Sequence, residues 1–356
     1  MRVTNNTFPD TLLGHLQRVT KEMNTLNEQV ATGQRISKVS EDSASANRIL
    51  DMQEEKARIS QYSKNASRAQ NINNTTISQL QNFIQISDRV SELATLADGL
   101  SGEDGMKAYA EEVDELIEHA MQSANAKFNG EYIFAGVDTG NQPFQVLEME
   151  DDDGNVFSRD LAAGTVTMTA PDGSSHTLDL ATNAVTALDS SGSSVTPTLS
   201  ADDLAFPDSG KILSVEYTGA ESGSEFHLSE TGTISPYTDG STNEEFATFI
   251  NRMIELRDAM ETGEPDAVSG TLRTELEDSE DSLIFALSRQ GSVQMRIEFD
   301  LSLNEQRFTD LEENISAEAD VDIAQTVVKL TQVQNAYQAS LKSAGQVLDQ
   351  SLLDYL

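Results

Sequence analysis

Apolar residues recur with heptad spacing at both ends of this 356-residue chain, and no other feature restricts the fold as much. Near the front, steps of four and three residues alternate through Leu12, Leu16, Val19, Met23, Leu26 and Val30. Near the end, the same alternation runs through Ile323, Val327, Leu330, Gln334, Tyr337, Leu341, Ala344 and Leu348. Such spacing is typical of helices that bury one stripe against another helix. A helix of this length is marginal alone in water, so the two ends are predicted to cover each other.

Two helices alone would leave part of this apolar surface bare, because Val328, Val333 and Val347 lie beside the rear stripe. We therefore interpret the paired stripes as an assembly surface that neighbouring copies complete. The alternative is an ordinary intramolecular helical hairpin. The predicted interface residues are Leu12, Leu16, Val19, Met23, Leu26, Val30, Ile323, Val327, Leu330, Tyr337, Leu341 and Leu348.

Between the two ends, the sequence predicts further long helices. Residues 44–97 contain no Pro or Gly, and their seam runs through Ala69, Asn73, Thr76, Leu80, Phe83, Ser87, Val90, Ala94 and Ala97. GLSGEDG (99–105) predicts a turn and 106–128 another helix. Helix returns from Phe246 to Met260, GEP (263–265) interrupts it, and a long helix begins near Ala267.

The amino-acid composition changes in residues 137–245, which are rich in Gly, Ser, Thr and Asp. Short alternating runs such as GTVTMTA and KILSVEY are separated by PDG, SSG and DSG turns, which predicts a small β-rich insert. The predicted fold class is mainly α: an elongated coiled-coil helical bundle formed by both termini, with an inserted β-rich domain. The expected domains are 1–40 plus 321–356, 41–136 plus 246–320, and 137–245.

The net charge differs between the two ends of the chain and its middle. The chain carries a formal net charge of -37, yet residues 1–100 are neutral, residues 321–356 carry -1, and residues 137–245 alone carry -18. Neutral ends can crowd together, whereas the acidic middle favours solvent. No basic face exists to neutralise phosphates, so nucleic acid is not an expected partner. No apolar run is long enough to span a membrane, and no cleaved signal peptide is visible.

Candidate chemistry in the sequence is sparse. With no cysteine, disulfides, thiol catalysis and Cys-based metal sites are excluded. The four histidines, at 15, 119, 176 and 227, have no metal-binding spacing and are interpreted as surface or packing residues. EMEDDDGNVFSRD (148–160) places Asp151 and Asp153 at EF-hand positions, but Met149 stands at the first ligand position, so we interpret it as a solvated acidic turn. No catalytic residue, metal or cofactor is predicted.

Several stretches resemble the bacterial flagellin superfamily. ATGQRISKVSEDSASANRI (31–49) is similar to the stretch between its first two helices, residues 52–94 to the long helix that follows, and residues 323–356 to its last helix. FNGEYIFAG (128–136) and the ending SLLDYL (351–356) look more like the hook-associated junction members than the filament subunits. DRVSEL (88–93) departs from the pattern, because flagellins often carry a second arginine there, and this puts recognition by innate-immune receptors in doubt.

The resemblance implies a non-enzymatic subunit that joins the flagellar hook to the filament. It further implies type III export without a cleaved signal peptide, an extracellular location, and terminal helices that order only in the assembly. The implied partners are other copies of the chain, the first hook-associated protein, flagellin, and an export chaperone that binds the C-terminal helix. The alternatives are flagellin itself, or a surface adhesin or glycan module carried by the insert. An enzyme active site hidden in the insert has no residues to support it.

Overall fold

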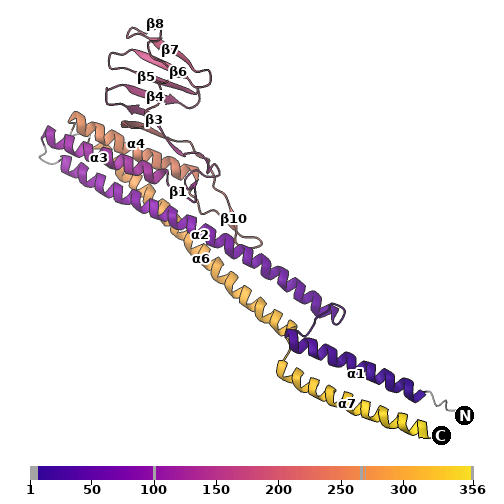
Figure 1. Ribbon diagram of the computed structural model, residues 1–356. Coiled ribbons are helices and arrows are strands. Elements are labelled where there is room, and N and C mark those ends of the chain that lie inside the picture. Colours follow the sequence, from indigo (N-terminus) through magenta and orange to yellow (C-terminus); the bar gives the residue numbers. More distant parts are fainter. Residues whose placement is uncertain (1–6, 99–101, 265–267, 269, 354–356) are drawn as a thin grey trace. The chain divides into compact units, whose positions relative to one another are not determined.

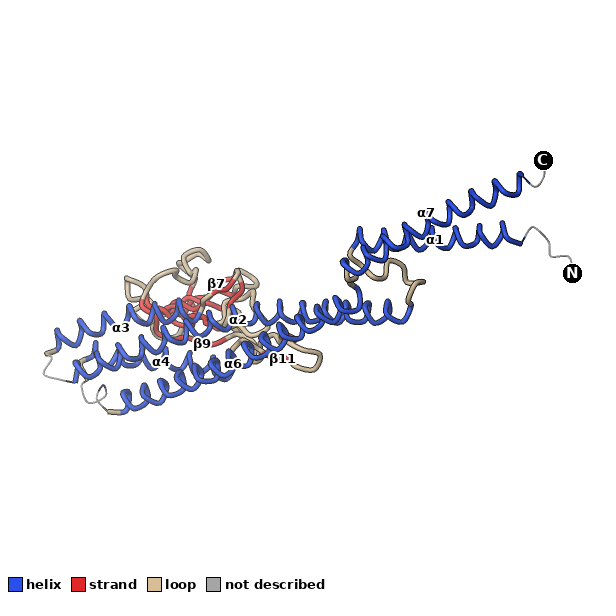
Figure 2. The backbone as a smooth tube through the Cα atoms, turned by 90° about the horizontal axis from the view of Figure 1, so that it is seen from below, coloured by secondary structure: helices blue, strands red, loops and turns tan. Residues whose placement is uncertain are grey.

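The protein is described by a computed structural model, which covers residues 7–98, 102–264, 268 and 270–353. The chain forms two compact units, residues 1–63 with 302–356 and residues 64–301. The predicted class, mainly α with a β-rich insert, is confirmed (Figures 1 and 2). The helices are α1 (Thr7–Thr32), α2 (Ser43–Asp98), α3 (Glu103–Ala124), α4 (Gly240–Thr262), α6 (Thr271–Ala319) and α7 (Ile323–Leu353). None of these described helices is long and apolar enough to cross a membrane.

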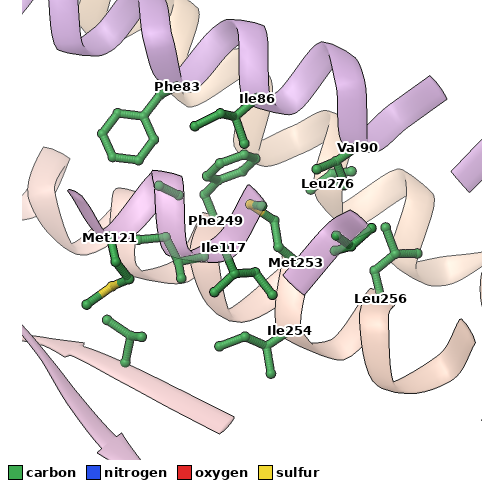
Figure 3. Close-up of a cluster of buried hydrophobic side chains, with 14 of the residues drawn as sticks. Phe83, Ile86, Val90, Ile117, Met121, Phe249, Met253, Ile254, Leu256 and Leu276 are labelled. Carbon is green, nitrogen blue, oxygen red and sulfur yellow. The ribbon is translucent and has the colours of Figure 1, made fainter. Parts of the chain in front are cut away.

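The seam predicted along α2 is the spine of the larger unit. All nine of its residues are buried: Ala69, Asn73, Thr76, Leu80, Phe83, Ser87, Val90, Ala94 and Ala97. Side chains of α3, α4 and α6 close over it, including Ile117, Phe249 and Leu276 (Figure 3). The Phe83 ring stacks on Phe246 with 5.5 Å between centroids. The 4-3 spacing was therefore a sound indicator of the core, although three of the seam side chains are polar.

The bounds of α3 and α4 differ from the prediction, and α3 begins at Glu103 and not at residue 106. The predicted helix start near Ala267 and residues 99–101 of the predicted turn lie outside the described residues. Helix α4 begins at Gly240 and not near Phe246, because Asp239 caps it by accepting a hydrogen bond from the Thr242 amide at 3.1 Å. Helix α3 ends at Ala124 and not at Phe128. The Asn125 side chain binds both the amide and the carbonyl of Phe144, at 3.1 and 3.0 Å, and so turns the chain toward the sheet. The predicted end of α4 is confirmed, with Gly263 in the left-handed conformation.

The FNGEYIFAG stretch makes a tight corner at the end of α3. Strands β1 (Lys127–Phe128) and β2 (Glu131–Tyr132) form a hairpin with positive φ at Asn129 and Gly130. Phe134 then enters the bundle core, and its carbonyl accepts hydrogen bonds from the Asn243 side chain and the Tyr217 hydroxyl, at 2.8 and 3.0 Å. Gly136 follows at φ +67°, where a Cβ would lie 2.6 Å from the Ala220 carbonyl oxygen.

The insert forms a seven-stranded antiparallel sheet in the order β8-β7-β6-β5-β4-β3-β9. Its strands are β3 (Phe144–Glu150), β4 (Val156–Asp160), β5 (Thr165–Thr169), β6 (Ser175–Asp179), β7 (Ala184–Leu188), β8 (Ser194–Val195) and β9 (Lys211–Tyr217). The β9 edge meets α4, where the Asn251 side chain binds the amide and carbonyl of Val215 at 2.9 and 2.8 Å. That contact covers an edge that would otherwise be open to pairing. The opposite edge, β8, pairs only with β7 among the described strands.

A repeat with a period of 19 residues builds this sheet. Gly154, Gly173 and Gly192 occupy equivalent hairpin turns and all have positive φ. At the other end of the strands, Asp160 and Asp179 each accept hydrogen bonds from two backbone amides of their turn, at 2.8 to 2.9 Å. One face is closed by a separate small core of Phe157, Val166, Met168, Leu178 and Leu204.

A short hairpin of β10 (Phe226–His227) and β11 (Thr233–Ile234) lies against α2 and α6 within the same unit. The Asn65 side chain donates to the His227 carbonyl at 3.0 Å, and Arg296 donates to the Thr233 carbonyl at 3.1 Å. Leu228 and Ile234 complete a small apolar cluster with Ile297. This hairpin therefore braces the two long helices.

Candidate assembly interface

Helices α1 and α7 lie side by side in both views and form the smaller unit with the first part of α2 and the last part of α6 (Figures 1 and 2). The α1 stripe lies largely on the side of α1 that α7 covers. Val19 is buried, and Leu12, Leu16, Met23, Leu26 and Val30 are half-buried. Leu13, one position from the stripe, is 60% exposed.

The α7 stripe divides between covered and uncovered residues. Leu330 and Tyr337 are half-buried. Ile323, Val327 and Leu341 are exposed, with 52%, 42% and 46% of their surface accessible. Leu348 lies in α7 but outside the residues whose side chains the structure describes.

The covered face of α7 is shifted from the predicted one. Its buried and half-buried positions are Thr326, Leu330, Val333, Tyr337, Ser340 and Ala344. These also step by four and three residues, and they share every second position with the predicted stripe. The sequence reasoning missed Thr326, Val333 and Ser340 because it followed the more apolar alternative. As a result, an apolar row of Ile323, Val327 and Leu341 on one side of α7, with Val328 on another side, stays uncovered in the single chain.

The connections beneath this helix pair are tied together by backbone hydrogen bonds. Gly33 ends α1 with φ +74°, a conformation that favours glycine. Its carbonyl accepts from the Val321 amide at 2.9 Å, and the Arg35 amide donates to the Ala319 carbonyl at 2.6 Å. Gln34 and Asp320 thereby form a short antiparallel bridge. These bonds fix the register of α1 against α7.

Arg35 reinforces the same junction. Its guanidinium donates to the Glu318 carbonyl at 3.1 and 2.9 Å and to the Glu318 carboxylate at 3.3 Å. Arg48 of α2 pairs with the other Glu318 oxygen at 3.0 Å. No spacing rule links Arg35 to a residue 283 positions away, so the sequence offered no signal for this contact.

Two carboxylates order the loop between α1 and α2. The Ser45 amide, with help from the Ser45 hydroxyl and Arg35, lowers the pKa of Asp42, which caps α2. The Ser37 amide lowers the pKa of Glu41 in the same way. Both groups are therefore charged at neutral pH, and both brace the loop from its solvent side.

The described residues contain no cluster of His, Asp and Glu side chains arranged to hold a metal. His15, His119 and His227 are exposed, and His176 is buried against Thr198 with 3.2 Å between Nε2 and Oγ1. The acidic run at 148–160 forms strands and a turn. In that turn, Asp151 accepts hydrogen bonds from the amides of Asp153 and Asn155 at 3.0 and 2.8 Å.

Comparisons with known proteins find similarity to a flagellin family model and to two solved flagellar proteins. Residues 3–139 match the family model described as the bacterial flagellin N-terminal helical region. The fold is similar to that of Bacillus cereus FlgL, with 16% identity, TM-score 0.51, and coverage of 75% of this chain and 99% of the other. It is also similar to a putative flagellar hook-associated protein from Vibrio parahaemolyticus, with 11% identity, TM-score 0.55, and coverage of 79% and 100%. No curated protein sequence matches the chain.

Proposed function

We propose that this chain, whose residues 3–139 carry the flagellin N-terminal helical region and whose fold is shared with flagellar hook-associated structures, joins the hook to the filament of the bacterial flagellum. It does so as a structural subunit without enzymatic activity. The relatives named above are described as FlgL and as a hook-associated protein, and the proposal extends that role to this chain.

The observation that carries the proposal is the uncovered apolar row on α7. Exposed β-branched and leucine side chains at 323, 327, 328 and 341 have no partner row among the described residues of α1. Three of these side chains, at 323, 327 and 341, lie on one side of the helix, and exposed apolar side chains on one side of a helix favour an interaction surface. Neighbouring copies supply the cover, and the twelve predicted interface residues are the proposed seam.

The contact between copies is head-to-tail. An interface that does not close upon itself builds helical layers, as a tubular assembly requires. The subunits to either side are the first hook-associated protein and flagellin, and an export chaperone covers the C-terminal helix before assembly. The chain leaves the cell by the flagellar type III pathway and acts outside it.

The marginal stability of α1 and α7 as a pair bears on when the two helices become ordered. A two-helix pair with one shared stripe is only marginally stable, so we infer that both terminal helices gain their full stability in the assembly. Amide hydrogen exchange on the isolated monomer tests this. We expect weak protection in 12–30 and 323–348, and strong protection in both segments contradicts the inference.

The location of the protein in a flagellum tests the function itself. Immunogold labelling of isolated flagella with an antibody to the 137–245 insert is expected to mark only the hook–filament junction. Label along the whole filament would instead identify flagellin, the alternative that the family match over residues 3–139 keeps open. Long filaments grown from the purified chain alone would point to the same alternative.

A further inference from the structure

The buried seam between α2 and α6 becomes polar at one level. Asn73 and Thr76 of α2 are both 0% exposed, and Gln290 of α6 is 2% exposed. The Asn73 side chain donates to the Gln290 backbone carbonyl at 3.3 Å. The Thr76 hydroxyl donates within its own helix, to the Ile72 carbonyl at 3.1 Å. We call Asn73, Thr76 and Gln290 the polar layer.

Two acceptor atoms of the polar layer have no hydrogen-bond partner. The side-chain oxygens of Asn73 and Gln290 are buried, and no described residue donates to either of them. Water satisfies such an atom in the unfolded chain, so burying it without a partner is unfavourable. Pairing of the two helices is therefore less favourable at this level than elsewhere along the seam.

A cavity of about 330 Å³ borders the polar layer. Arg289, Gln290, Val293 and Arg296 line it from α6, together with residues between 221 and 239. Side-chain atoms that face a cavity have no van der Waals neighbours on that side. The layer therefore combines unpaired buried oxygens with incomplete packing.

Apolar packing resumes on both sides of the polar layer, but as two separate clusters. The large cluster includes, from α2 and α6, Leu80, Phe83, Leu283 and Ala286. The buried members of the small cluster are Ala66, Ala69, Leu228, Ile234 and Ile297. No residue of α2 between Ala69 and Leu80 belongs to either cluster. The layer thus marks a gap in the apolar core.

We propose that the polar layer divides the α2–α6 pair into two parts that open separately. Residues 64–72 and 291–301, with the hairpin β10–β11, open first while the bundle beyond the layer stays folded. The small cluster buries less apolar surface, because two of its five buried members are alanine, whereas the large cluster includes Phe83, Phe246 and Phe249. The opened form is a minor species under native conditions, so global melting remains a single transition. The proposal concerns the single chain and does not depend on the proposed function.

The hairpin is tied to the part of the helix pair that opens. Asn65 and Arg296 donate to its carbonyl groups, and Arg68 lies over the Phe226 ring at 5.9 Å. Arg68 also pairs with Glu131 of β2 at 3.4 Å, but both side chains are largely exposed. An exposed ion pair of this kind adds little resistance to opening.

Native-state hydrogen exchange of the full-length chain in increasing urea tests the division. Amides in 64–72 and 291–301 are expected to exchange about tenfold faster, or more, than those in 80–94 and 276–286. Their exchange should also depend less on urea, because partial opening exposes less surface than global unfolding. A common exchange free energy and urea dependence in all four segments would show one cooperative unit and overturn the proposal.

Apolar replacement of the polar layer sharpens the test. Asn73→Leu combined with Gln290→Leu removes both unpaired oxygens at similar side-chain size, and should slow exchange in 64–72 and 291–301 about tenfold relative to 80–94. Asn74→Leu, at the exposed neighbouring position, is the matched control and should leave this ratio unchanged. Equal slowing in all segments, or the same change in the control, contradicts the role of the layer. If the double variant does not fold, the exchange pattern of the unaltered chain decides the question.

Discussion

The seam residues of α2 and those of the terminal helix pair have the same 4-3 spacing. They are nevertheless buried to different extents. Every residue of the α2 seam is at most 2% exposed. In the terminal pair, Val19 is buried, whereas three of the α7 interface residues expose 42% or more. The difference comes from the number of neighbours. Helix α2 is covered by three other helices and α1 largely by one, so equal spacing predicts an apolar face but not what covers it.

This contrast separates the two sources of stability in the molecule. The larger unit satisfies its seam within the chain and is expected to melt as an ordinary cooperative domain. The terminal pair leaves part of its seam for other molecules. Substitutions in the two regions should therefore affect different measurements.

The largest effect is expected from charge in the terminal seam. Leu341→Asp should abolish stable filament attachment, because the interface would bury an unpaired carboxylate. The melting temperature of the monomer should scarcely change, since Leu341 is exposed there. Leu26→Asp, at a half-buried position, should impair both. The measurements are electron microscopy of flagella and thermal melting, with Asp202→Ala as a neutral control. Normally attached filaments in both variants would contradict the interface.

A large stability effect is expected in the bundle core. Phe246 is fully buried between Phe83 and Phe134. Phe246→Ala should lower the free energy of unfolding by about 3–5 kcal/mol through lost burial and a residual cavity. Leu330→Ala, in the half-buried terminal pair, should have a much smaller effect in the monomer. Equal losses in urea unfolding would show that the two regions do not differ as described.

A smaller effect is expected at the start of α4. Burial raises the pKa of Asp239, but hydrogen bonds from Thr242 and Arg289 outweigh it and leave the pKa lowered. Asp239→Ala should reduce the free energy of unfolding by about 1 kcal/mol through loss of the cap.

The pH dependence of the Asp239 contribution has a definite sign. Because the folded pKa is lowered, the stabilisation is present above the unfolded value near 4 and is lost as pH falls through the folded pKa. Asp239→Asn keeps a capping group and removes the charge, so the stability gap between this variant and the parent should close below about pH 4. A gap that widens on acidification would contradict the assignment.

The smallest effect is expected at the junction beneath α1 and α7. Glu318→Gln weakens partly exposed ion pairs to Arg35 and Arg48 and should change stability by less than about 1 kcal/mol. Its clearer signature is faster hydrogen exchange at the Arg35 and Val321 amides, which hold the bridge. Glu312→Gln removes a pair to Lys56 in the same unit and serves as the control. Equal exchange in the two variants would remove the assigned role of Glu318.

The sequence predicted the elements that depend on local periodicity. The helical seam of α2, the break at Gly263 and the β character of the insert follow from spacing and turn chemistry. The covered face of α7 could not be predicted in this way. Stripes of equal period begin at positions 326 and 327, and only packing against the partner helix determines which stripe is covered. The Arg35–Glu318 contact and the strand order also could not be predicted from local spacing, because both depend on pairing between distant segments. The 19-residue spacing of Gly154, Gly173 and Gly192 was the available signal for the sheet.

Among the described residues, that sheet meets the helices along β9, which lies on α4 with Asn251 completing its hydrogen bonding, and at the start of β3, which Asn125 holds. The far margin ends at the short strand β8. Lengthening the meander there by one 19-residue hairpin unit is expected to leave the β9–α4 contact in place. The β8 edge of the sheet can therefore vary in sequence and length while the buried helices keep their sequence. We expect the turn at residues 190–193 to accept an inserted foreign peptide.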